Sequence, residues 1–221
     1  MSLFRDDVLQ PERTALVKIR ARSKAQPRST QSLFSGNTGT SLFAPREHKP
    51  SRRHDLVYPG ESGTQIERIR YIIGRAESFR DGYDAVQHGA KIKPGKPPTM
   101  LTLADINHWI DTTPGQPHAI GRYQFIPKTL RRLTAALDVG PNALFNPELQ
   151  DALSDLLLEE AGLTAFIEGV IGRHQFMNNL AKIWAGLPNS SGKSHYDGYA
   201  GNKASMTWDR FDQEMAKIFP S

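Results

Sequence analysis

Glu77 is the residue with the clearest chemical potential in this sequence, because it continues an apolar helical stripe. Ile66, Ile69, Ile73 and Glu77 are spaced at i, i+3, i+7 and i+11, which places all four on one face of an α-helix. If that face is buried, desolvation raises the pKa of the Glu77 carboxyl, and a position in the last helical turn acts in the same direction. A carboxyl that keeps its proton near neutral pH can act as the general acid in cleavage of a glycosidic bond. From spacing alone, a helix-end Glu that turns into solvent is the more common arrangement.

A second carboxyl near Glu77 would decide how a glycosidic bond is cut. Asp81 and Asp84 follow Glu77 closely in the sequence. A retaining glycosidase places its second carboxyl ~5 Å from the first, whereas an inverting enzyme places it farther away to leave room for water. The position of Asp84 is compatible with either role. We favour the simpler interpretation, in which the Asp84 side chain caps the turn after the helix.

Aromatic and amide side chains later in the chain are candidates for contact with a sugar, because pyranose rings stack on aromatic faces and hydrogen-bond to amides. Tyr123 and Gln124 form a polar-aromatic strip directly before a new helix. Trp184 lies at helical spacing and is as consistent with the core as with a cleft. Tyr196 and Tyr199 lie in a Gly/Ser/Asn-rich loop, which makes them better cleft candidates.

The elements that would position these residues are mostly helices. Thr102 and Asp105 have capping-box spacing, Pro127 is typical of a first helical turn, and Asn146-Pro147 is a cap followed by a first-turn proline. The predicted helices span about 64–79, 102–111, 127–140, 146–162, 163–171, 176–187 and 207–219. Residues 83–100 contain several glycines and prolines and predict a loop with a short hairpin at most. The expected fold class is α+β, mainly α, with a small β-hairpin region beside a helical lobe.

Composition excludes several classes of site. The 221 residues include no Cys, which rules out disulfides and thiolate metal sites. The seven His are scattered without metal-ligand spacing, so we expect neither a metal nor another cofactor. No Gly-x-Ser-x-Gly elbow is present, and the Gly192-Lys193-Ser194 string lacks phosphate-loop spacing. The N-terminus has no apolar signal segment, and no run approaches the ~18 apolar residues of a membrane span. We therefore expect synthesis in a cytoplasm.

The excess positive charge lies in residues 1–60, which contain 11 Lys and Arg against 5 Asp and Glu, whereas residues 61–221 contain 17 against 18. This uneven distribution of charge therefore predicts a basic, extended or disordered arm over 1–60 and a folded domain over 61–221. Ser-Leu-Phe occurs three times in the arm, either as docking motifs for a partner or by coincidence. No known nucleic-acid-binding pattern accompanies the charge, which favours a solvated tether over a specific nucleic-acid contact.

Several strings in this chain resemble the lambda-endolysin-like lytic transglycosylases of the lysozyme-like superfamily. They occur in the same order over about residues 66–219, and an Asn146–Asp151 helix start accompanies them. Gly121–Leu130 is also similar to a segment of bacterial lytic transglycosylases. The strings are Glu77-Ser78, Gly82-Tyr83-Asp84-Ala85-Val86, Gly121-Arg122-Tyr123-Gln124, and Ile183-Trp184-Ala185-Gly186-Leu187-Pro188 with Tyr196 beyond.

The resemblance implies a lysozyme-like fold and cleavage of the β-1,4 bond between N-acetylmuramic acid and N-acetylglucosamine in peptidoglycan. It implies that Glu77 is the single catalytic acid and that the product carries a 1,6-anhydro-muramoyl end. The substrate-binding positions that it implies are Ser78, Tyr83, Asp84, Tyr123, Gln124, Trp184 and Tyr196.

The chain also departs from that family. The segment between Glu77 and Gly82 is shorter, and the basic arm has no counterpart in lambda endolysin. Hydrolytic phage-T4-like lysozymes place an Asp nine residues after the Glu, where this chain has Val86. This difference favours transglycosylation. Hydrolysis by a muramidase or a chitinase-like enzyme remains an alternative, with Asp84 as the second acid. A virion structural module without catalysis is a further alternative. Because a free endolysin needs no such arm, we expect a virion-associated enzyme, held to other phage proteins and acting on the cell wall after delivery.

Overall fold

The computed structural model describes residues 58–199 and 201–220, so the predicted arm lies outside the described residues apart from Tyr58, Pro59 and Gly60. The described part contains seven α-helices, in agreement with the predicted number, and two short 3₁₀-helices. These are α1 (Gln65–Ser78), η1 (Gly82–Asp84), η2 (Pro98–Met100), α2 (Leu103–Thr112), α3 (Pro127–Ala136), α4 (Pro147–Glu160), α5 (Leu163–Ile167), α6 (Arg173–Ile183) and α7 (Trp208–Ile218).

Local capping explains where the helices begin. Thr64 forms a capping box at the start of α1, and Thr102 does the same with Asp105 at the start of α2, as predicted. The Asn146 side chain accepts a hydrogen bond from the backbone N–H of Leu149 at 2.9 Å, which fixes the first turn of α4. These contacts satisfy N–H groups that have no partner within the helix.

Besides the helix predicted over 127–140, which ends at Ala136, two further predicted helices have wrong boundaries. The helix predicted over 163–171 ends at Ile167, because Gly169 adopts a positive φ of 73° that no helix can continue through. The next helix begins at Arg173 and ends at Ile183, so Trp184 to Leu187 form a loop rather than its last turn. This second difference places the loop beside α1.

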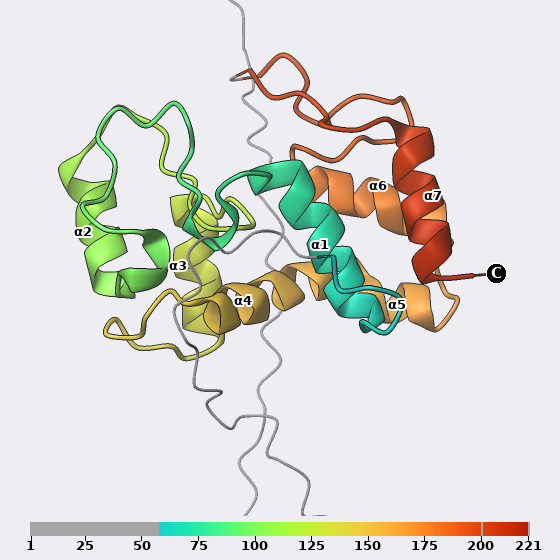
Figure 1. The fold of residues 1–221 in the computed structure, drawn as a ribbon, viewed down its shortest axis with the longest axis horizontal. Helices are drawn as coiled ribbons and strands as arrows, with labels where there is room; N and C mark the ends of the chain where they lie inside the picture. The colour runs from blue at the N-terminus through green and yellow to red at the C-terminus, as the bar shows by residue number, and fades with distance from the viewer. Residues whose placement is uncertain (1–57, 200, 221) are drawn as a thin grey trace, which may run out of the picture. The chain divides into compact units, whose positions relative to one another are not determined.

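The helices are arranged on both sides of α1 and α4 (Figure 1). α2 and α3 lie on one side, and α5, α6 and α7 lie on the other. α1 contacts α7 and η1, while α4 contacts both α3 and α5. The apolar faces of these helices meet in one continuous core that includes Ile69, Ile73, Leu153, Phe176 and Phe211. α1 and α4 therefore connect the two groups of helices.

The predicted β-hairpin is absent from residues 58–199 and 201–220, where only isolated β-bridges occur, including Val86 with Ile120 and Ile120 with Phe125. Within this segment, Pro94, Pro97 and Pro98 lack the N–H that a strand ladder requires. The N–H of Thr99 is in turn bonded to the Asp84 side chain at 2.9 Å. The mainly α part of the prediction is confirmed.

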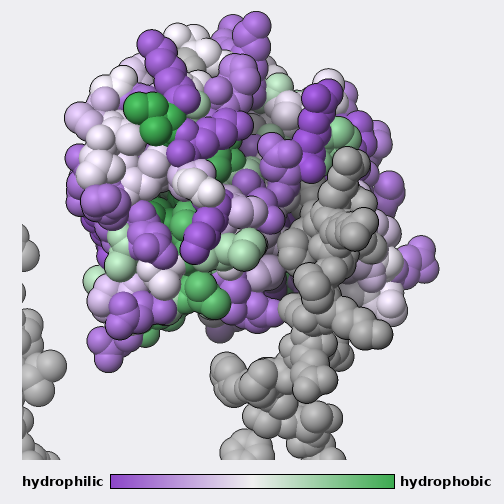
Figure 2. Space-filling model, turned by 60° about the vertical axis from the view of Figure 1, so that its left-hand side comes forward, coloured by the Kyte–Doolittle hydropathy of each residue, from purple (hydrophilic) through white to green (hydrophobic). Residues whose placement is uncertain are grey.

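Figure 2 shows the face on which the α2 and α3 side of the molecule comes forward. Apolar patches on this face are separated by hydrophilic residues. Large apolar side chains that are more than half exposed in the described chain include Ile92, Met100, Ile126 and Leu144. The apolar area of this face is thus divided among small patches.

The turn at Gly121 requires a glycine. Its φ is +78°, and a Cβ built there would lie 2.4 Å from the Gln150 Oε1 atom and 2.8 Å from the Phe145 ring. The turn is closed by two backbone hydrogen bonds between Ile120 and Phe125, at 3.1 and 2.9 Å. Both the left-handed backbone and the packing therefore exclude a side chain at this position.

We expect Gly121→Ala to lower the free energy of unfolding by about 2–4 kcal/mol, because left-handed strain adds to overpacking. Gly140→Ala is the matched control: Gly140 has no positive φ, and no atom lies within 4 Å of a built Cβ. Chemical denaturation of both variants measures the difference. Equal stability of the two variants would contradict the argument.

Candidate active site

Glu77 lies in the last turn of α1, and the helical stripe that leads to it is buried as predicted. Ile69 and Ile73 are 1% and 0% exposed, whereas Glu77 itself keeps partial exposure. The Glu77 Oε1 atom accepts a hydrogen bond from the backbone N–H of Gly186 at 2.7 Å. Desolvation raises the pKa of Glu77 from about 4.5 to about 7, and the Gly186 hydrogen bond acts in the opposite direction. The carboxyl is thus protonated in a large fraction of molecules at neutral pH.

The loop after α6 supplies that hydrogen bond through a close backbone approach. A Cβ built on Gly186 would lie 2.4 Å from the carbonyl oxygen of Ala76 and 3.1 Å from Glu77 Oε1. Any larger residue would push the loop away from the end of α1. The sequence places Gly186 within the Ile183–Pro188 motif, but the motif alone does not indicate a role for it.

Two serines hold this loop in place. The Ser194 hydroxyl donates to the carbonyl of Ala185 at 2.7 Å, and Ser194 is only 3% exposed. The backbone N–H and the hydroxyl of Ser205 both donate to the carbonyl of Gly186, at 2.8 and 3.0 Å. Neither serine belongs to a recognisable motif, so the sequence alone offers no signal for them.

Two predicted substrate contacts close to Glu77 in sequence each have a hydrogen-bond partner within the protein, and their contact with substrate stays a prediction. The Ser78 hydroxyl donates to the carbonyl of Gly74 at 3.1 Å, within its own helix. The Asp84 Oδ1 atom accepts the N–H of Thr99, so Asp84 ties η1 to η2. As predicted, the Asp84 side chain accepts a backbone N–H. The donor is Thr99 of η2, however, and not a residue of the turn after α1.

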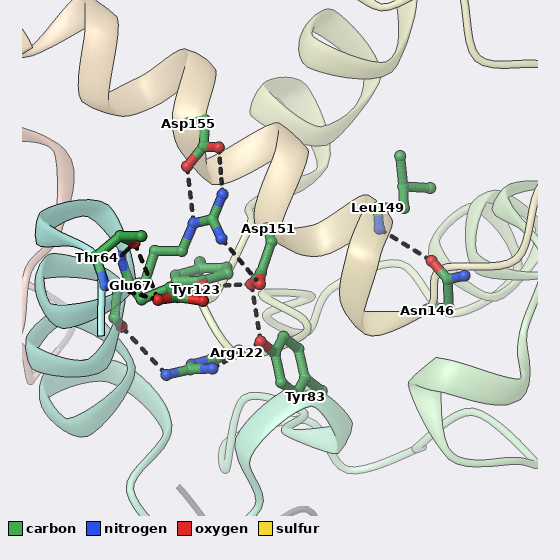
Figure 3. Close-up of polar contacts among 10 residues, drawn as sticks. Thr64, Glu67, Tyr83, Arg122, Tyr123, Asn146, Leu149, Asp151 and Asp155 are labelled. Atoms are coloured by element: carbon green, nitrogen blue, oxygen red, sulfur yellow. Dashed lines mark hydrogen bonds and ion pairs between the residues drawn. The ribbon is translucent and has the colours of Figure 1, made fainter. Parts of the chain in front are cut away.

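Asp151 is the centre of a polar network that sequence reasoning did not identify (Figure 3). Its Oδ1 atom accepts hydrogen bonds from the hydroxyls of Tyr83 and Tyr123, at 2.9 and 2.5 Å. Its Oδ2 atom is 3.2 Å from Nη1 of Arg70, which comes from α1. Burial, followed by the negative charge of Asp151, raises the pKa of Tyr83 to about 12 and that of Tyr123 well above its ordinary value. Both hydroxyls therefore remain donors.

Two arginines extend this network. Arg70 forms a two-point ion pair with Asp155, one turn further along α4. Nη1 of Arg122 donates to the Tyr83 hydroxyl at 2.7 Å, and its guanidinium lies over the Tyr83 ring, 4.8 Å from the centroid. The network joins α1, η1, the Gly121 turn and α4.

Two of the predicted sugar contacts are core residues, because Tyr123 and Trp184 are each 2% exposed. These two side chains pack in the core and do not form an accessible wall of a sugar-binding cleft. Gln124 is partly exposed with φ of +48°, and its Nε2 donates to the carbonyl of Gly121 at 2.9 Å. Tyr196 is 39% exposed, although its hydroxyl donates to the carbonyl of Lys182. Tyr199 is 74% exposed. Sugar contact by Gln124, Tyr196 and Tyr199 stays a prediction.

Within the described residues, no group of three or more His, Asp and Glu side chains is placed to hold a metal ion. Over the same residues, no helix combines the length and the apolar character that crossing a membrane requires.

Comparison with known proteins finds a likeness among solved structures. No known family model matches the chain, and no curated protein matches its sequence. The chain resembles a lysozyme from bacteriophage lambda, with 20% identity and a TM-score of 0.42, over 71% of this chain and 92% of that one. A bacteriophage lambda lysozyme complexed with a chitohexasaccharide gives 19% identity, with the same coverage and TM-score. Both matches are to the group of proteins that the sequence motifs resemble.

We expect Asp151→Ala to lower the free energy of unfolding by about 2–4 kcal/mol, because it removes an acceptor of two tyrosine hydroxyls and of the Arg70 guanidinium. Asp111→Ala removes an exposed ion pair with Arg131 and should cost less than about 1 kcal/mol. Urea denaturation compares the two variants. A cost for Asp151→Ala no larger than that of this control would show that the network does not stabilise the fold.

Proposed function

We propose that this chain cleaves the β-1,4 bond between N-acetylmuramic acid and N-acetylglucosamine in peptidoglycan, as a lytic transglycosylase. The observation that carries the proposal is the Glu77 carboxyl, whose pKa is raised to about 7 and whose position is fixed by the Gly186 N–H. Cleavage of a glycosidic bond needs a group that is protonated near neutral pH and is held rigidly. The choice of peptidoglycan as substrate follows from the motifs around Glu77, Gly121 and Trp184.

A single carboxyl can perform both halves of this reaction. Protonated Glu77 donates its proton to the glycosidic oxygen as the bond from that oxygen to C1 of the muramoyl residue breaks. The Glu77 carboxylate then accepts the proton of the muramoyl C6 hydroxyl, whose oxygen bonds to C1. The products are a free 4-hydroxyl and a 1,6-anhydro ring, and Glu77 regains its proton. A pKa near 7 suits a group that must both donate and accept one proton.

Hydrolysis is the alternative, either as a muramidase or as a chitinase-like reaction. It requires a second acid or base that activates water. Asp84 is the candidate, but one of its oxygens is already engaged by the N–H of Thr99. Val86 stands where hydrolytic phage-T4-like lysozymes have an Asp. Both observations favour transglycosylation. A non-catalytic virion module would need no carboxyl of raised pKa.

We also propose that residues 1–60 attach the enzyme to other phage proteins, so that it travels with the virion and acts on the cell wall after delivery. The support is the concentration of positive charge and of Ser-Leu-Phe repeats in that segment. Release from the host cytoplasm as a free endolysin is the alternative. Co-purification of the chain with virions, compared with a variant lacking residues 1–57, tests the attachment.

Mass spectrometry of soluble fragments released from purified peptidoglycan tests the proposed reaction. We expect wild type to release anhydro-muropeptides and Glu77→Gln, which cannot donate or accept the proton, to release at least about 100-fold less. Reducing-end muropeptides would instead establish hydrolysis. Absence of fragments from wild type would contradict enzymatic function altogether.

The pH dependence follows from the raised pKa of Glu77. Because the protonated form begins the reaction, kcat/KM should be constant at acidic pH and fall as pH rises through about 7. At one unit above that pKa, about a tenth of the molecules carry the proton. Initial rates on solubilised glycan strands from pH 3 to 9 measure the profile. A decline that begins near pH 4.5 would show that Glu77 is not the desolvated acid.

A further inference from the structure

A groove is lined by residues that follow, in sequence, the helix that carries Glu77. It has a volume of about 320 Å³ and lies between the turn at 81–86 and the loop at 93–98. The backbone N–H of Asp81 donates to the carbonyl of Ser78 at 3.0 Å, so one wall of the groove is attached directly to the end of α1. The residues that line it are Asp81, Asp84, Val86, Lys93, Pro94, Gly95, Lys96, Pro97 and Pro98.

The two walls of this groove carry opposite charges. One wall contains Asp81 and Asp84, and the other contains Lys93 and Lys96. Both lysines are exposed, and neither forms a salt bridge with any described residue. The lining also includes apolar surface from Val86 and three prolines. The groove therefore suits a small ligand that bears both carboxylates and an ammonium group.

The basic wall is held in shape before any ligand arrives. The carbonyl of Ile92 accepts hydrogen bonds from Trp109 Nε1 and Gln116 Nε2, both at 2.8 Å, and the N–H of Ile92 donates to Gln116 Oε1. At the other end, the N–H of Thr99 is bonded to Asp84. Prolines between these two anchors restrict the backbone further. A preorganised wall loses little conformational entropy when it binds.

We propose that this groove binds the peptide stem of the glycan strand, with the stem carboxylates toward Lys93 and Lys96 and its free ammonium toward Asp81 and Asp84. The inference rests on the proposed function, because a peptide stem is attached to the muramoyl residue whose bond would be cut. A stem is a short peptide with several carboxylates, small alanine methyl groups and, on its diamino acid, a free ammonium. The groove would make the enzyme select strands that carry stems over bare glycan.

The test compares glycan strands that carry stems with the same strands after an amidase has removed them. The test variant is Lys93→Gln/Lys96→Gln. Lys91→Gln/Lys128→Gln is the matched control, because it removes the same charge from exposed lysines outside the groove. We expect the test variant to lose about tenfold in kcat/KM on stem-bearing strands and to change less than about twofold on bare strands. The control should change equally on both substrates.

An equal loss on both substrates, or no loss on either, would overturn the inference. A binding measurement keeps the test independent of catalysis: a free stem tetrapeptide is titrated into the full chain, and amide chemical shifts are followed by NMR. We expect saturable shifts at Gly95, Lys96 and Thr99 that require at least about fivefold more peptide in the test variant. Absence of saturable shifts would overturn the inference even if the enzyme were active. Binding without any turnover of strands would refute the proposed function and leave the groove assignment standing.

Discussion

The contact on which the site depends is the approach of the Gly186 backbone to the last turn of α1. It places an N–H 2.7 Å from the Oε1 atom of the Glu77 carboxyl, which keeps partial exposure. The approach is possible only because residue 186 has no side chain, since a Cβ would lie 2.4 Å from the Ala76 carbonyl oxygen. Desolvation, which raises the pKa, is thus stronger than the single hydrogen bond that lowers it. The same contact positions the acid and sets its proton affinity.

Other contacts in the fold hold the Gly186 loop and α1 in the positions that this contact requires. Ser194 and Ser205 hold the loop through hydrogen bonds to its carbonyls, and the buried Ile69 and Ile73 hold α1 in the core. Asp151 on α4 joins α1 to η1 and to the Gly121 turn through Arg70, Tyr83 and Tyr123 (Figure 3). A partly buried carboxylate with three donors is costly to disrupt, so this network limits relative movement of the elements around the acid.

The sequence was sufficient for features that depend on local periodicity and capping. It predicted the number of helices, their starts at Thr64, Thr102 and Pro127, and the buried stripe that ends in Glu77. It failed where long-range contacts decide the outcome. Tyr123 and Trp184 have the composition of a sugar-binding wall but are buried in the core, and the hairpin is replaced by proline-rich loops. The roles of Gly186, Ser205 and Asp151 depend on residues tens of positions away, which no local pattern encodes.

The most direct test of this account is the pKa of Glu77 itself. Carboxyl ¹³C shifts of the full chain, labelled at glutamate and recorded from pH 3 to 9, would follow its titration, and the spectrum of Glu77→Gln would assign the signal. We expect a midpoint near 7 for Glu77. A midpoint near 4.5 would contradict it, because Glu77 would then be an ordinary helix-end carboxylate without the proton that the proposed reaction needs.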